Sequence, residues 1–382
     1  MARWELARLP HITGGPGARD AAGPLAAALT GPGAAVLLVA DPGLAATGLV
    51  DDVRASLAGA GLAVETFSDF TGDPTAAQAD AAAAVARRSK AAAVVALGGG
   101  SALDLGKAVA AIATDTAPAV AYQLCERDFP AATLARIAIP TTSGTGSEAT
   151  RTAILTRADK AKVWLWGDAL KPHEIILDPE TTLSLPPALT AQTGIDALVH
   201  ALEAATNANA TPANRLYAHE AIRLAARHLE PAVADGANLE ARAGLQRAAW
   251  LAGIAIDNGG TAVAHTIGHA LASLRPLHHG RSVALGMIAT LDWNIVDDDG
   301  RFDAAARAMG LGAARDLPAA FERLTRGIGI RVSLAEEFAG IAPETLSAQM
   351  ARPENAAMRH SNRRRIEDAD LLVFAERVLT QA

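Results

Sequence analysis

The chain has 382 residues, more than a single hydrophobic core usually organises, so two domains are expected. Half of the residues are hydrophobic but only 4% are aromatic, which favours α/β or helical structure over an aromatic-rich β-sandwich. The net charge of -7 argues against a general affinity for nucleic acid, and no apolar run reaches the roughly 20 residues that span a bilayer.

The cysteine content and the N-terminus point to a cellular compartment. The single cysteine, Cys125, cannot form an intramolecular disulfide. The first residues lack the basic segment followed by an apolar segment that marks a secretory signal. We therefore expect a cytoplasmic protein whose partners are small molecules, without a nucleic-acid or membrane partner.

The first half of the chain alternates short apolar runs with helical stretches, which is the pattern of βαβ units. Buried parallel strands read as such continuous apolar runs. The expected strands are 34–40, 62–67, 91–97 and 137–140, and the expected helices lie near 50–60, near 76–89 and from about 101.

The character of the sequence changes near Pro186 and Pro187, after which apolar residues recur at helical spacing almost to the end. The sequence therefore predicts an α/β plus all-α protein. Residues 1–185 form a Rossmann-like, parallel-sheet, dinucleotide-binding domain, and residues 186–382 form a helical metal-binding domain. The active site is expected in the cleft between them, where ligand sites commonly lie.

Two glycine-rich segments follow predicted strands. In AVVALGGGSALDLGK a strand enters a glycine turn and then a helix, whose first backbone N–H groups can hold a pyrophosphate. A phosphate-loop NTPase motif does not fit, because five residues separate Gly100 from Gly106 and Ala108 follows Lys107. The segment IAIPTTSGTGSEATR lies one βαβ unit later, so both loops should leave the same carboxyl edge of the sheet. Taken alone, this second loop could also be a capped helix N-terminus.

Histidine and aspartate side chains recur at helical spacing in the second half. Asp196 and His200 are four residues apart, as are His265 and His269, and His279 follows. Residues four apart share a helix face, where a carboxylate and imidazoles can converge on one divalent cation. A single such pair is more often an ordinary polar helix face, whereas two pairs and a further histidine favour a metal site.

Four motifs in this order resemble the iron-containing (group III) alcohol dehydrogenases. They are GGGSALDLGK, PTTSGTGSE, DPETTLSLPPALTAQTGIDALVHALEA and GTAVAHTIGHALASLRPLHHG. The similarity extends from about residue 39 to about residue 291.

The resemblance implies one divalent metal, Fe2+ or in some members Zn2+, held by Asp196, His200, His265 and His279. It implies that His269 is not a ligand but a catalytic residue that relays a proton or positions the substrate. The cofactor contacts it implies are Asp41, Gly98, Gly99, Gly100, Ser101, Thr141, Thr142, Thr145, Ser147 and Lys162. A carboxylate at Asp41 should repel a 2′-phosphate, which favours NAD over NADP.

The implied function is that of a metal-dependent oxidoreductase, an alcohol dehydrogenase or aldehyde reductase. It transfers a hydride between an alcohol and a nicotinamide, with the metal polarising the substrate oxygen. Two alternatives remain: a maleylacetate-reductase-like enzyme, and a dehydroquinate-synthase-like cyclase or lyase that uses NAD and a metal. The first usually lacks a pair such as Asp196 and His200, and the second should bring more basic residues.

The substrate and the oligomeric state are less constrained. Arg275, His278 and Arg281 lie beside the last expected ligand, and Arg359 precedes His360. Because guanidinium groups bind carboxylates and phosphonates bidentately, a small anionic aldehyde is one hypothesis, and a solvated basic rim is the alternative. The resemblance implies a homodimer or a larger homo-oligomer.

Overall fold

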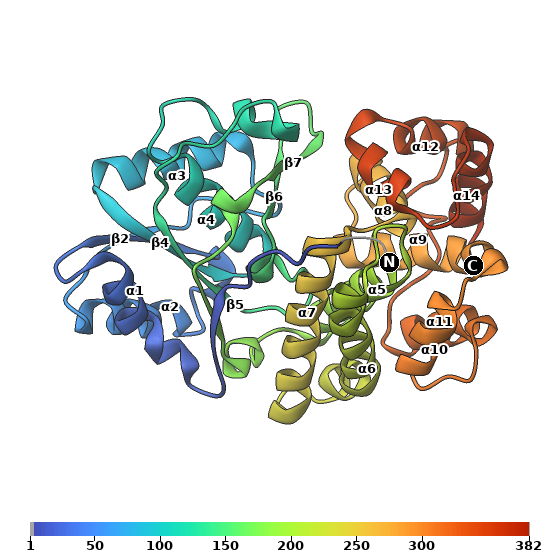
Figure 1. Cartoon of the computed structure of the whole chain (residues 1–382), viewed down its shortest axis with the longest axis horizontal. Coiled ribbons are helices and arrows are strands. Elements are labelled where there is room, and N and C mark those ends of the chain that lie inside the picture. Colours follow the sequence, from blue (N-terminus) through green and yellow to red (C-terminus); the bar gives the residue numbers. More distant parts are fainter. Residues whose placement is uncertain (1–3, 382) are drawn as a thin grey trace. The chain divides into compact units, whose positions relative to one another are not determined.

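The computed structural model describes residues 4–381 and divides into two compact units (Figure 1). An α/β unit comprises residues 8–142 and 147–184. A helical unit comprises residues 185–382 together with residues 143–146 and the described residues before Arg8. The architecture is therefore the predicted one, an N-terminal parallel-sheet unit followed by a helical unit.

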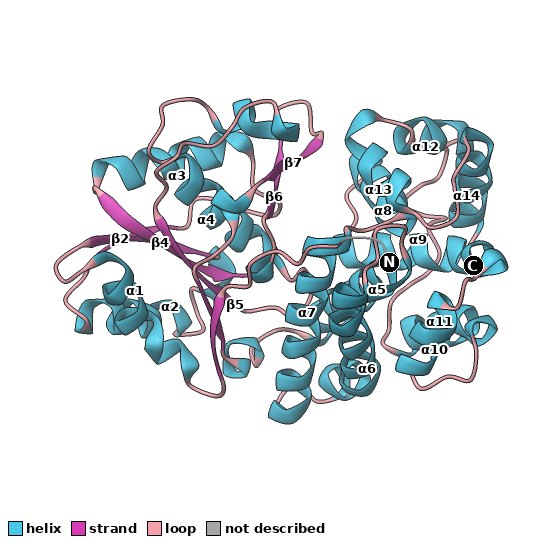
Figure 2. Ribbon diagram, in the orientation of Figure 1, coloured by secondary structure: helices cyan, strands magenta, loops and turns pink. Residues whose placement is uncertain are grey.

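The α/β unit contains a six-stranded sheet in the order β1-β8-β5-β4-β2-β3, and every neighbouring pair is parallel. Figure 2 shows part of this sheet between its helices. The strands are β1 (His11–Gly14), β2 (Ala35–Ala40), β3 (Ala63–Phe67), β4 (Ala91–Gly98), β5 (Ala135–Pro140) and β8 (Glu174–Leu177).

Helices cover both faces of the sheet: α1 (Ala22–Thr30), α2 (Leu49–Gly59), α3 (Ala76–Arg88) and α4 (Gly100–Ile112). Successive side chains of a strand point to opposite faces. In β2, Val36 and Leu38 pack with α1 and α2, whereas Leu37 and Val39 pack with α3 and α4. The continuous apolar run of this strand is thus explained by burial on both faces.

The expected strands and helices of the first half are confirmed to within a few residues. Strands β1 and β8 were not predicted, because each has only four residues and β1 has a single apolar one. An antiparallel hairpin of β6 (Thr152–Thr156) and β7 (Lys162–Trp166) was also missed. The second glycine-rich loop ends in a single 3-10 turn, Ser147–Ala149, so the alternative of a capped α-helix there is wrong.

The helical unit is organised around α5 (Pro187–Thr206), which is buried on nearly all sides. Helices α6 (Pro212–Ala234), α7 (Leu239–Gly259) and α9 (His279–Asn294) pack against it. The remaining helices are α8 (Val263–Leu274), α10 (Arg301–Ala308), α11 (Leu317–Gly327), α12 (Pro343–Met350), α13 (Ala356–Ser361) and α14 (Asp368–Thr380). A second core joins α8 and α9 to α12 and α14. Among the described helices, none has the length and apolarity to cross a membrane.

Residues 143–146 belong to the helical unit because two glycines let the backbone pack closely there. A Cβ on Gly144 would lie 2.7 Å from the Cβ of Thr193 on α5. A Cβ on Gly146 would lie 2.5 Å from the Cα of Gly253 on α7. The predicted division at residues 185 and 186 did not anticipate this segment, since close packing between distant glycines leaves no local pattern.

Candidate metal centre and nucleotide loops

Four side chains predicted as metal ligands lie together in the helical unit. Helix α5 carries Asp196 and His200, α8 carries His265, and His279 is the first residue of α9. One ligand atom from each of the four lies within 4.8 Å of the others. The packing of three helices therefore brings together four side chains, of which only Asp196 and His200 were already neighbours by helical spacing.

The donor atoms are spaced as a metal site requires. The Asp196 Oδ1 lies 3.8 Å from His200 Nε2, 3.9 Å from His265 Nε2 and 3.6 Å from His279 Nε2. In a tetrahedron with metal–ligand bonds of about 2.1 Å, ligand atoms are about 3.4 Å apart. The three separations from Asp196 are a few tenths of an ångström longer, and all four atoms lie within 4.8 Å of one another, so the donors can close on one divalent cation by contraction.

Buried polar atoms at this cluster lack protein partners. Among the described residues, neither Asp196 Oδ1 nor His265 Nε2 has a hydrogen-bond partner, although both side chains are almost fully buried. Leaving such an atom unsatisfied costs about 1–3 kcal/mol. A cation held by all four side chains would satisfy both atoms, so the chemistry of the cluster fits a metal.

Burial keeps the imidazole of His265 neutral. Burial first, and the neighbouring His200 second, lower the pKa of His265 to about 3, while Asp196 acts in the opposite direction. The two rings are stacked with their centroids 4.6 Å apart. A neutral imidazole has a lone pair to donate, which is the form that binds a metal.

Glu203 is a buried residue that the sequence reasoning missed. Its carboxylate lies 2.6 Å from the Nδ1 of His265 and accepts hydrogen bonds from the backbone N–H groups of Ala262 and Ala264. Burial raises the pKa of Glu203 to about 7, and these two amides act in the opposite direction. The spacing of Asp196, His200 and Glu203, at i, i+4 and i+7 on one helix face, was the available signal.

Other histidines near the cluster have different surroundings. His269 lies one turn after His265 on α8, and its ring centroid is 5.5 Å from that of His279. It is half-buried and lies outside the four-residue set. His278 is exposed and caps α9, its Nδ1 accepting a hydrogen bond from the N–H of Gly280.

In the α/β unit, three of the predicted cofactor segments leave adjacent strands at one edge. Asp41 follows β2, Gly98 ends β4 and Thr141 follows β5, and the register pairs Ala40 with Leu97 and Gly98 with Pro140. Gly98 has a positive φ of 153°, and a Cβ there would lie 2.7 Å from the Cβ of Asp41. Only glycine fits between these two segments, and the shared carboxyl edge is confirmed.

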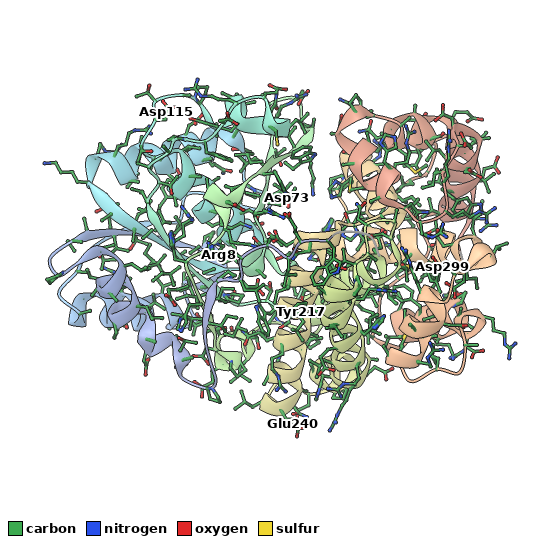
Figure 3. All side chains as sticks on the ribbon, in the orientation of Figure 1. Arg8, Asp73, Asp115, Tyr217, Glu240 and Asp299 are labelled. Atoms are coloured by element: carbon green, nitrogen blue, oxygen red, sulfur yellow. The ribbon has the colours of Figure 1, made fainter. Side chains whose placement is uncertain are left out.

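The remaining predicted cofactor residues have varied positions. Gly99 precedes α4, and Gly100 and Ser101 begin it, which leaves their N–H groups at a helix N-terminus. Thr142 lies against Gly99. Thr145 belongs to the segment that groups with the helical unit. Lys162 is the first residue of β7 and is ion-paired with Asp73, which is labelled in Figure 3, at 2.8 Å.

A buried ion pair on α4 anchors the second loop. Lys107 Nζ lies 3.2 Å from Asp104 Oδ1 and donates to the carbonyl oxygens of Ser147 and Thr152. Asp104 in turn accepts hydrogen bonds from the hydroxyl of Ser147 and the N–H of Ile154. The Ser147 side chain thus holds its own loop, in addition to any cofactor contact.

Replacing Lys107 with Met is expected to destabilise the α/β unit by about 3–5 kcal/mol, because Asp104 would keep a largely buried charge without its partner. The loop at Ser147 would also lose its anchor, so binding of the nicotinamide cofactor expected from the sequence should weaken. Denaturant midpoints and NADH fluorescence titration would measure both effects. An R54M variant on the exposed face of α2 is the control, and equal behaviour of the two variants would contradict the anchoring role.

Arg281, which the anionic-substrate hypothesis counted among the groups that bind the substrate, is engaged within the protein instead. Its guanidinium donates to the carbonyl oxygens of Arg331 and Ser333 and to the carboxylate of Glu337, and the side chain is largely buried. It therefore ties α9 to the segment after α11. Arg275 is exposed at the end of α8, and Arg359 is ion-paired with Asp368.

A parallel-sheet unit with glycine-rich loops at its carboxyl edge, joined to a helical unit with a three-histidine, one-aspartate cluster, defines a class of two-part oxidoreductases. Residues 10–179 match the family model for iron-containing alcohol dehydrogenase, and residues 190–377 match the model for the C-terminal part of the Fe-containing alcohol dehydrogenase family. The chain belongs to the iron-containing alcohol dehydrogenase family.

Individual relatives agree with this assignment. Choline dehydrogenase of Bacillus subtilis is 36% identical over 284 residues, which cover 73% of this chain and 70% of the relative. 1,3-Propanediol dehydrogenase of Klebsiella pneumoniae is 35% identical over 337 residues, 85% of this chain and 87% of the relative. The structure of sulfoacetaldehyde reductase from Bifidobacterium kashiwanohense in complex with NAD+ superposes with a TM-score of 0.92 at 28% identity, covering all of both chains.

Proposed function

We propose that this protein is a metal-dependent, NAD-linked dehydrogenase that interconverts an alcohol with an aldehyde or ketone. The observation that carries the proposal is the cluster of Asp196, His200, His265 and His279, with its buried and unsatisfied Oδ1 and Nε2 atoms. The family assignment supports the reaction class. The maleylacetate-reductase-like and synthase-like alternatives are disfavoured by the Asp196–His200 pair and the glycine loops.

The proposed reaction needs residues that hold a metal and a residue that transfers a proton. When bound, a divalent metal supplies Lewis-acid polarisation of the substrate oxygen. The four side chains would hold it, and Fe2+ is our assignment because of the family, with Zn2+ suited to the same donor set. His269, half-buried and one turn from His265, would carry the hydroxyl proton toward solvent.

For the cofactor we propose NAD, with its pyrophosphate at the N-terminus of α4 and its adenosine ribose near Asp41. The NAD+ complex of the sulfoacetaldehyde reductase supports this choice. The partly buried carboxylate of Asp41 also accepts a hydrogen bond from the N–H of Gly43, which keeps it at the end of β2. A 2′-phosphate would meet this negative charge.

Replacing Asp41 with Asn should remove that repulsion while keeping an acceptor for Gly43. The ratio of kcat/KM for NADP to that for NAD is expected to rise at least tenfold, which corresponds to about 1.4 kcal/mol. D51N, which changes an exposed carboxylate on α2, is the matched control. An unchanged ratio in D41N would place the ribose elsewhere.

For the substrate we infer a small aldehyde that carries an anionic group. The sulfoacetaldehyde reductase neighbour supports this class. Arg275, exposed at the end of α8, offers positive charge on the element that bears His265 and His269. A clear preference for a neutral aldehyde of equal length would exclude the anionic class.

The function is tested by reconstituting metal-stripped protein anaerobically with Fe2+ or Zn2+ and following NADH absorbance with neutral and anionic short aldehydes. Metal-dependent NADH consumption is the expected result. Bound metal and cofactor without oxidation of NADH or NADPH would favour the synthase-like alternative instead.

A further inference from the structure

We propose that Glu203 is a positioning residue that orients His265 for metal binding and fixes α8 to α5. The inference rests on the proposed metal site. It concerns a side chain that is not itself in the four-residue cluster and lies one helical turn beyond His200.

The first argument is the choice of His265 tautomer. The Nδ1 of His265 lies 2.6 Å from Glu203 Oε2, an oxygen that already accepts the N–H of Ala262, while Oε1 accepts the N–H of Ala264. Both oxygens act as acceptors, so Nδ1 is the donor of the third hydrogen bond and the lone pair lies on Nε2. That Nε2 is the atom 3.9 Å from Asp196 Oδ1, on the side of the cluster. Carboxylates in this position fix the ring and raise the basicity of the ligand.

The second argument is the position of the helix itself. Helix α8 begins without a side-chain cap of its own. Glu203 supplies one from α5, because its two oxygens accept from the N–H groups of Ala262 and Ala264, each at 2.7 Å. The same carboxylate thus sets both the backbone of the first turn of α8 and the ring of His265.

The burial of the carboxylate argues for a role beyond capping. Glu203 is only 3% exposed, and removing a carboxylate from water costs several kcal/mol unless hydrogen bonds offset it. A Ser, Thr or Asp at the start of α8 would cap the helix without that cost. Placing the acid on α5 instead adds the contact to the Nδ1 of His265, which a local cap would not make.

The test compares E203Q with the wild-type protein for metal affinity. Gln keeps the shape of the side chain, but its NH2 group must face an N–H donor and the negative charge is lost. We expect the dissociation constant for Zn2+ or Co2+ to rise 10–100-fold, the range typical of such changes. The visible absorption spectrum of the Co2+ protein should also change. NADH affinity, for which most of the proposed contacts lie in the α/β unit, should not.

D298N is the matched control, since Asp298 likewise accepts two backbone N–H groups at the start of a helix, α10, and is not one of the four clustered side chains. Wild-type protein that binds no metal would contradict the proposed function itself. Wild-type binding with equal affinity and an equal Co2+ spectrum in E203Q would overturn the role of Glu203 alone.

A second measurement covers the case in which E203Q does not fold. The 15N chemical shifts of His265 in the wild-type Zn2+ protein report which ring nitrogen carries the proton. A protonated Nδ1 and a metal-bound Nε2 are expected. The opposite arrangement would overturn the inference.

Discussion

Replacing Asp196 with Asn should abolish stoichiometric metal binding and lower kcat/KM by roughly a thousandfold. Asp196 is the shared neighbour of three imidazole nitrogens, at 3.6–3.9 Å, and the only charged group among the four expected ligands. Lewis-acid stabilisation is worth several kcal/mol, and about 4 kcal/mol corresponds to a factor of a thousand. Metal content by elemental analysis and steady-state kinetics would measure the two effects.

Because Asn fills the same buried volume as Asp, D196N removes the charge of this side chain without changing its packing. The metal-free D196N protein should unfold at a temperature close to that of metal-free wild type, whereas added metal should stabilise only the wild type. D298N provides the control for a changed carboxylate elsewhere in the helical unit. Full metal content together with activity within tenfold of wild type would remove Asp196 from the ligand set.

Replacing Gly280 with Ala should destabilise the helical unit by about 3 kcal/mol or more. A Cβ at this position would lie 1.7 Å from the carbonyl oxygen of Gln192 and 3.4 Å from the Cβ of Asp196. Backbone cannot yield as a flexible side chain does, so α9 would have to move away from α5, and overpacking of this kind is costly. Because His279 immediately precedes Gly280, metal affinity should fall as well.

Denaturant unfolding and metal titration of G280A would check both expectations. The control is G59A at the end of α2, where a Cβ would meet no atom within 4 Å. Ala there should be neutral or stabilising by up to about 1 kcal/mol, as its helix propensity predicts. Equal stability of G280A and wild type would mean that α5 and α9 are not packed as described.

The contacts that support the expected ligands were largely hidden from the sequence. The four predicted ligands are one helical pair, Asp196 and His200, and two separate histidines, His265 and His279, and three helices bring them together. Glu203 was overlooked although it continues the stripe of Asp196 and His200, because its partners Ala262 and Ala264 are backbone groups about 60 residues away. Lys107 was noted only for its place in a motif, and its ion pair with Asp104 depended on the folded loop.

By itself, the sequence determined the structural features that depend on a periodic pattern or on residues close together in the chain. Apolar runs such as that of β2 fixed the strands, the glycines after β4 fixed the turn, and four ordered motifs fixed the family. Tertiary structure decided what joins distant segments: the pairing of the short strands β1 and β8 at one side of the sheet, the placement of residues 143–146, and the engagement of Arg281 by Glu337. The physical reason is that hydrophobic periodicity follows the chain, whereas close packing and hydrogen-bond satisfaction depend on neighbours that folding brings together.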